Sequence, residues 1–138
     1  MAQIPKHYTG IGSRQTPKDI QLLMETLALK LYEQEHYILR SGGADGADTA
    51  FANKLPNTAK EVYLPWPSFN NITEGIVHQS PVAEFIASQL HPNWHNLTDG
   101  AKKLMIRNVY QITGTSFTNL SDFVICWTPD GCETAATT

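Results

Sequence analysis

Several features that mark membrane, secreted or metal-binding proteins are scarce or missing in this 138-residue sequence. No apolar run approaches the roughly 20 residues that span a bilayer, and no apolar secretion signal stands at the amino terminus. We therefore expect a cytoplasmic protein without a membrane partner. Two cysteines, Cys126 and Cys132, are too few for a disulfide framework, and their spacing does not suit a zinc site. We expect Cys126 in the core and no role for Cys132.

Positive charge is also in short supply. Ten basic residues face thirteen acidic ones, and neither lysine nor arginine occurs between Lys60 and Lys102. Proteins that bind nucleic acid by releasing counterions usually carry a basic stripe, so nucleic acid is an unfavoured partner. Only a local patch of Arg14, Arg40 and Arg107, brought together by folding, would change that expectation.

What the sequence does contain is an alternation of strand-like and helix-like segments. We expect strands at 7–11, 36–40, 61–66 and 122–127. Helices are expected after the caps Thr16, Ser80 and Thr98, and at 47–55. The first helix has an apolar stripe made by Ile20, Leu23, Leu27 and Leu31. This alternation predicts one α/β domain over residues 1–138, with a Rossmann-like three-layer fold and a mostly parallel central sheet.

Two glycine-rich loops follow the first two expected strands. They read GIGSR from Gly10 and SGGADG from Ser41. Ligands of parallel sheets bind beyond the carboxyl ends of the strands, and glycine lets a ligand approach the backbone. Neither loop is a P-loop or a complete G-x-G-x-x-G fingerprint, and each alone could be only a tight turn. Together they predict a phosphate-bearing ligand held by Gly10, Gly12, Ser13, Arg14, Ser41, Gly42 and Gly43.

Other residues near these loops have both plain and functional interpretations. Asp45 is a turn or helix-cap candidate, yet it or Asp48 could also bind a ribose or a base edge. Arg107 and Asn108 lie on an expected helix, as a solvated face or as ligand contacts. Trp66 and Trp127 follow strands, where they pack in the core or stack on a base. Arg107 and Asp45 are the candidates for a catalytic role.

We predict neither a metal nor a bound cofactor. His91 and His95 are four residues apart, but Pro92 argues against a continuous helix through both. A magnesium site needs several carboxylates, and only two lie close together in sequence near the second loop.

The stretches YTGIGSR, LRSGGADGADTAF, YLPW, RNVYQI and SDFVICWTPDG, in this order, resemble the SLOG superfamily. This Rossmann-like group includes the Lonely Guy phosphoribohydrolases and the fold of DNA-processing protein A, and the match is nearest to its small phage and bacterial members. The resemblance covers almost the whole chain. It implies a nucleotide or nucleotide-derived ligand at the carboxyl edge of the sheet. Carried over by motif, its ligand contacts are Gly12, Ser13, Arg14, Ser41, Gly42, Gly43, Asp45, Arg107 and Asn108.

The sequence departs from that superfamily after Trp127. Members usually continue with a glycine-rich phosphate loop, which in the Lonely Guy enzymes precedes a catalytic glutamate. Here the sequence reads TPDGCETAATT, and the spacing of Glu133 does not match. The chain is expected to be truncated or to lack this third loop, and an exposed sheet edge would then favour a homo-oligomer.

These observations predict a nucleotide-binding protein that acts as a sensor, a sequestering protein or a degenerate enzyme. Hydrolysis of the N-glycosidic bond of a nucleoside monophosphate is the first alternative. Binding of single-stranded DNA in recombination, suggested by the resemblance, is the second.

Overall fold

The computed structural model describes residues 4–131, along which strands and helices alternate. The strands are β1 (Lys6–Gly12), β2 (Tyr37–Ser41), β3 (Lys60–Leu64), β4 (Ile76–Val77) and β5 (Val124–Trp127). The helices are α1 (Lys18–Glu33), α2 (Ala47–Ala52), α3 (Pro81–Leu90) and α4 (Asp99–Thr113). Short 3-10 turns cover Asn57–Ala59, Phe69–Asn71 and Trp94–Asn96.

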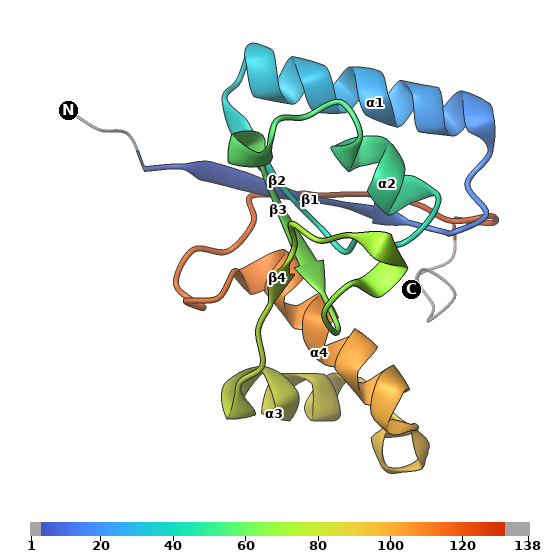
Figure 1. Ribbon diagram of the computed structural model, residues 1–138, viewed down its shortest axis with the longest axis vertical. Helices are drawn as coiled ribbons and strands as arrows, with labels where there is room; N and C mark the ends of the chain where they lie inside the picture. Colours follow the sequence, from blue (N-terminus) through green and yellow to red (C-terminus); the bar gives the residue numbers. More distant parts are fainter. Residues whose placement is uncertain (1–3, 132–138) are drawn as a thin grey trace.

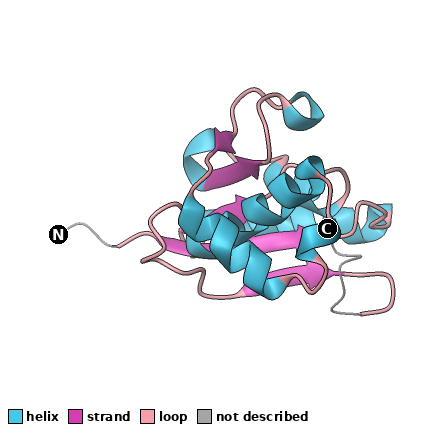
Figure 2. Ribbon diagram, turned by 90° about the horizontal axis from the view of Figure 1, so that it is seen from below, coloured by secondary structure: helices cyan, strands magenta, loops and turns pink. Residues whose placement is uncertain are grey.

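The five strands form one twisted, wholly parallel sheet in the order β4-β3-β2-β1-β5 (Figure 2). Helices α1 and α2 cover one face of the sheet, and α3 and α4 cover the other (Figure 1). This arrangement confirms the predicted α/β, Rossmann-like architecture. The carboxyl ends of β1 and β2 therefore meet at one edge, together with the loops that follow them.

Local sequence explains where α3 and α4 begin. The Ser80 hydroxyl accepts a hydrogen bond from Ala83 N at 3.1 Å, and the Thr98 hydroxyl accepts one from Ala101 N at 3.2 Å. Both predicted caps are thus confirmed. The prediction for α1 was wrong by one residue. This helix begins at Lys18 after Pro17, and the Thr16 hydroxyl donates to Ser13 O instead of capping the helix.

The buried face of α1 also differs from the predicted stripe. Met24 and Ala28 are buried, whereas Leu23 is 61% exposed. Ile20 and Leu31 do pack against the core, as expected. The prediction followed the leucines, but small Ala28 and flexible Met24 fit the close packing of α1 on α2 and the sheet.

Two further findings bear on the composition. No helix in the described part of the chain is both long enough and apolar enough to cross a membrane. Cys126 is exposed, which corrects the prediction that it lies in the core. It belongs to β5, at the edge of the sheet, where no neighbouring strand covers it. Cys132 and Glu133 lie outside the described residues.

Candidate functional site

Arg107 is the centre of the candidate site. It lies on α4, is only 4% exposed, and reaches the ends of two strands. Its Nη1 donates hydrogen bonds to the backbone oxygen of Gly42 and, at 3.4 Å, to that of Tyr63. Its Nε donates to Asn108 Oδ1 at 3.0 Å. The interpretation of Arg107 as part of a solvated helix face is therefore wrong.

Asp48, in the first turn of α2, is the buried carboxyl group of the candidate site. It is 6% exposed and accepts a hydrogen bond from Ala44 N at 3.2 Å. Burial raises the pKa of Asp48 to about 6, although the charge of Arg107 and the hydrogen bonds from the loop act in the opposite direction. Asp48 thus titrates close to neutral pH.

Arg107 and Asp48 do not form an ion pair. Within residues 4–131, the only ion pairs closer than 4 Å join Glu61 to His7 and to Arg40. Burial lowers the pKa of Arg107 to about 10; the negative charge of Asp48 acts in the opposite direction, and the positive charge of Arg14 lowers the pKa further. The Arg107 guanidinium is therefore a desolvated cation that feels the charge of Asp48 but has no carboxylate of residues 4–131 at ion-pair distance.

Gly42 lies where three polar side chains converge. A Cβ atom at this position would stand 2.7 Å from Arg107 Nη1, 2.9 Å from Asp48 Oδ2 and 2.9 Å from Gln111 Nε2. The absence of a side chain at Gly42 therefore lets α4 and α2 bring their polar groups to the end of β2. The close approach of these three side chains, and not a left-handed backbone conformation, explains why position 42 is glycine.

A cavity of about 200 Å³ opens beside these groups, at the carboxyl ends of β1 and β2. Its polar side chains come from β1, α2 and α4, and Asn108 Oδ1 ties Arg107 to Gln111, whose Nε2 lies 3.0 Å away. The Thr9 hydroxyl donates to the backbone oxygen of Gln111 and so fastens α4 to β1. The lining residues are Thr9, Ile11, Gly12, Ala44, Asp48, Arg107, Asn108, Gln111 and Ile112.

Several polar groups of the first glycine loop form hydrogen bonds within the protein. Ser13 N donates to Trp127 O at 3.0 Å, and Ser13 O accepts from Ala47 N at 3.3 Å. The Ser13 hydroxyl accepts from Gln15 N at 3.0 Å. Polar groups of this loop are thus used to hold the protein together. A Cβ at Gly46 would lie 2.5 Å from Ser13 O, so this glycine is required because the two loops pack directly on each other.

Several residues predicted to contact the ligand make packing contacts or hydrogen bonds within the protein. Gly10 faces Leu39 and Phe51, and the Ser41 hydroxyl donates to Gly10 O at 2.6 Å. Gly43, at φ +73°, faces the side chains of Leu64 and Ile72. Asp45 is exposed and accepts a hydrogen bond from Asn70 Nδ2 at 2.9 Å, so it caps no helix.

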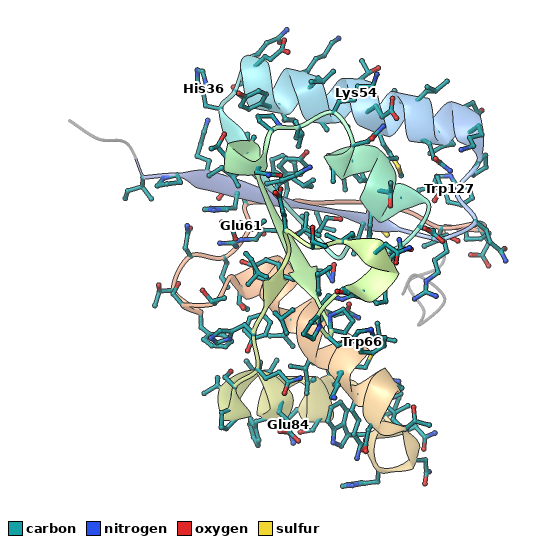
Figure 3. The ribbon with its side chains drawn as sticks, in the orientation of Figure 1. His36, Lys54, Glu61, Trp66, Glu84 and Trp127 are labelled. Atoms are coloured by element: carbon teal, nitrogen blue, oxygen red, sulfur yellow. The ribbon has the colours of Figure 1, made fainter. Side chains whose placement is uncertain are left out.

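The two tryptophans lie apart (Figure 3). Trp127 packs on the core cluster beneath α1 and α2, on the face of the sheet opposite α4. Trp66 is partly exposed on the α4 side and meets the Phe69 ring edge-on, with ring centroids 5.4 Å apart. The Phe69 ring in turn lies 5.5 Å from the Arg107 guanidinium.

Within the described residues, neither a cluster of Arg14, Arg40 and Arg107 nor a metal-binding group of side chains accompanies this cavity. Arg40 is buried against Glu61, so it does not join Arg14 and Arg107 at an open surface. Residues 4–131 contain no group of three or more His, Cys, Asp or Glu residues that could hold a metal ion. His91 ends α3, while His95 lies in a separate turn.

Sequence reasoning did not assign Thr9, Ile11, Gln111 and Ile112 to the site. The spacing of Gln111 could have pointed to it, because it stands four residues after Arg107 and three after Asn108 on one helix. Thr9 and Ile11 alternate with Tyr8 and Gly10 on β1, and only the packing of α4 shows which set faces the cavity.

Comparisons of this chain with family models, with curated proteins and with solved structures found no match.

Proposed function

We propose that this protein binds a nucleotide or nucleotide-derived anion in the Arg107 cavity, with a phosphate against the Arg107 guanidinium. The observation that carries this proposal is a buried arginine that lines a cavity and has no carboxylate of residues 4–131 within ion-pair distance. Leaving such a charge unbalanced is costly in the free protein. A bound phosphate would balance it and accept paired hydrogen bonds from the planar guanidinium.

The position and the surroundings of the cavity fit the same ligand class. The carboxyl edge of a parallel sheet is the usual place for nucleotides, and the SLOG resemblance implies the same edge. Arg14 adds positive charge close enough to affect Arg107. Asn108 and Gln111 place amide groups on the wall, suited to sugar hydroxyls or base edges. The cavity volume suits a phosphate or sugar, with the base extending outward.

A thermal-shift screen followed by calorimetry tests the proposal. The probes are nucleoside mono-, di- and triphosphates, cyclic nucleotides, ADP-ribose, inorganic phosphate and an oligothymidine. A ligand at 100 times its dissociation constant stabilises the folded state by about 2.7 kcal/mol. For a domain of this size that raises Tm by roughly 8 °C, at about 3 °C per kcal/mol.

Arg107→Met should reduce the affinity of the responding nucleotide at least tenfold. Lys103→Met is the matched control, because it removes an exposed positive charge from the same helix and should leave the affinity unchanged. Equal losses in the two variants would assign binding to general electrostatic attraction and would contradict the proposal. A flat response to every probe would also contradict it.

One observation favours a second candidate, hydrolysis of the N-glycosidic bond of a nucleoside monophosphate. Asp48 lines the Arg107 cavity, and burial raises its pKa to about 6, close to the value that suits a general acid or base at neutral pH. Water would add to the sugar carbon while the base leaves with a proton. Free-base release that Asp48→Asn abolishes while binding persists would support hydrolysis. No release from any bound nucleotide would exclude it.

A further inference from the structure

Strand β5 forms one edge of the described sheet and has backbone groups without a strand partner. Phe123 O accepts from Thr9 N, and Trp127 O accepts from Ser13 N, both at 3.0 Å. The backbone groups of alternate residues in a strand point to opposite sides. Residues 123, 125 and 127 therefore face β1, whereas Val124 and Cys126 direct their N–H and C=O groups away from the sheet. The complement to such an edge is another strand.

The side chains of β5 do not protect this edge. Val124 is 49% exposed and Cys126 is exposed, both on the face shared with α4. Natural edge strands are usually blunted by lysine, proline, a bulge or short length. Residues 123–127 read FVICW and contain neither charge nor proline. The opposite edge strand, β4, has only two residues and offers much less backbone for pairing.

We propose that a second copy of this chain pairs with β5, antiparallel and about a two-fold axis beside Ile125, so that one sheet continues through both copies. A two-fold interface uses the same strand from each copy and closes on itself, so it gives a dimer and not a fibre. Pairing of β5 with β4 of another copy would instead be head-to-tail and open-ended.

Strand length and charge favour this register over two others, with the axis at Val124 or at Cys126, that also keep the outward-directed backbone groups of the two strands opposite each other. With the axis beside Ile125, Val124 faces the Cys126 position of the other copy, and Phe123 faces the Trp127 position. Moving the axis to Cys126 would place Val124 opposite the Thr128 position, beyond the end of β5 at Trp127. Moving it to Val124 would place the charged Asp122 opposite the apolar Cys126 position. Only the Ile125 register pairs residues 123–127 of one copy with the same residues of the other.

The proposed dimer interface lies near the Arg107 cavity. Cys126 is the register partner of Ile11, which lines that cavity. Partial desolvation and, to a smaller extent, the negative charge of Asp48 raise the pKa of the Cys126 thiol. A strand paired along β5 would therefore be separated from the cavity by β5 and β1 side chains.

Sedimentation velocity or light scattering over a wide protein concentration range tests the interface without any ligand. The wild-type chain should show a monomer–dimer equilibrium. Val124→Lys should shift it to monomer, because a lysine on each copy would meet the apolar strand of the other. Val77→Lys is the matched control on β4, where Val77 is 41% exposed, and should leave the dimer intact. Both positions are exposed, so both variants should fold.

Disulfide cross-linking tests the register. With Cys126 and Cys132 replaced by serine, Ile125→Cys should form a cross-linked dimer on mild oxidation, since the two positions face each other across the axis. Leu120→Cys, exposed and outside the strand, should not. A monomer at every concentration would overturn the proposal, as would a dimer that survives Val124→Lys or cross-links only through position 120.

Discussion

Arg40 and Arg107 are both buried on the α4 side of the sheet, yet their surroundings differ. Arg40, on β2, forms an ion pair with Glu61 at 3.2 Å and donates to Ile112 O and Asn119 O. Glu61 also bonds His7 at 2.8 Å. Arg107 makes its hydrogen bonds to backbone oxygens and one amide, and no carboxylate in the described range 4–131 lies within 4 Å of it.

This difference separates a structural arginine from a candidate binding arginine. The charge of Arg40 is balanced inside the protein, and its contacts tie the segment after α4 to the sheet. Arg107 has no carboxylate of residues 4–131 at ion-pair distance, and it lines a cavity. Burial alone therefore does not identify a binding residue. The nature of the partners does.

Among the variants considered, Arg40→Met should have the largest effect, a loss of stability. This change breaks the ion pair with Glu61 and removes one donor each from Ile112 O and Asn119 O, so the free energy of unfolding should fall by about 3 kcal/mol. Urea unfolding measures this loss.

Arg107→Met should lower the free energy of unfolding by about 1 kcal/mol or less, because the loss of its hydrogen bonds is offset by the removal of a desolvated buried charge. A larger loss at Arg107 would reverse the assignment of the two arginines.

The contributions of Asp48 and Glu61 to the free energy of unfolding should change with pH in opposite directions. The pKa of Asp48 is raised from 3.8 to about 6, so the folded state binds a proton before the unfolded state does. Stability should therefore rise as pH falls from about 7 toward 4, by about 2–3 kcal/mol from this group. Asp48→Asn should remove that rise in urea unfolding measured at a series of pH values.

Burial by itself would raise the pKa of Glu61, but Tyr63, His7 and Arg40 together lower it. Its stabilising contribution is present above the unfolded pKa, near 4.5, and is lost as pH falls below it. Glu61→Gln should therefore flatten the acid limb of the stability profile and leave the limb between pH 4 and 7 unchanged. The same flattening in both variants would show that the two sites do not differ as proposed.

Gly42→Ala should also have only a small effect on stability. The new methyl group would press on Arg107, Asp48 and Gln111, whose polar ends must shift, at a cost of about 1 kcal/mol. Nucleotide affinity should fall much more than stability, because the shift moves the Arg107 guanidinium. Gly100→Ala is the control, since its Cβ would stand 3.9 Å from Trp66 and meets ordinary contact. Calorimetry with unchanged affinity in Gly42→Ala would show that the loop is only a turn.

The sequence by itself determined the order of four of the five strands and of the four helices, but not strand β4, together with the caps at Ser80 and Thr98 and the convergence of two glycine loops at one sheet edge. These features follow from local chemistry: apolar periodicity, a hydroxyl before a helix, and the geometry of parallel strands. The same local rules misplaced the buried stripe of α1, because Leu23 and Met24 differ in burial only through what packs against the helix.

Only the tertiary structure decided which residues share the site. Gly42 and Arg107 are 65 positions apart, and nothing local distinguishes Gly42 from Gly46, which the two loops need for packing. Trp127 lies on the far side of the sheet because successive strand residues alternate between faces, and its register with Gly12 sets which face it takes. Long-range register and helix packing, which leave no local trace, place Arg107 beside the cavity and Arg40 against Glu61.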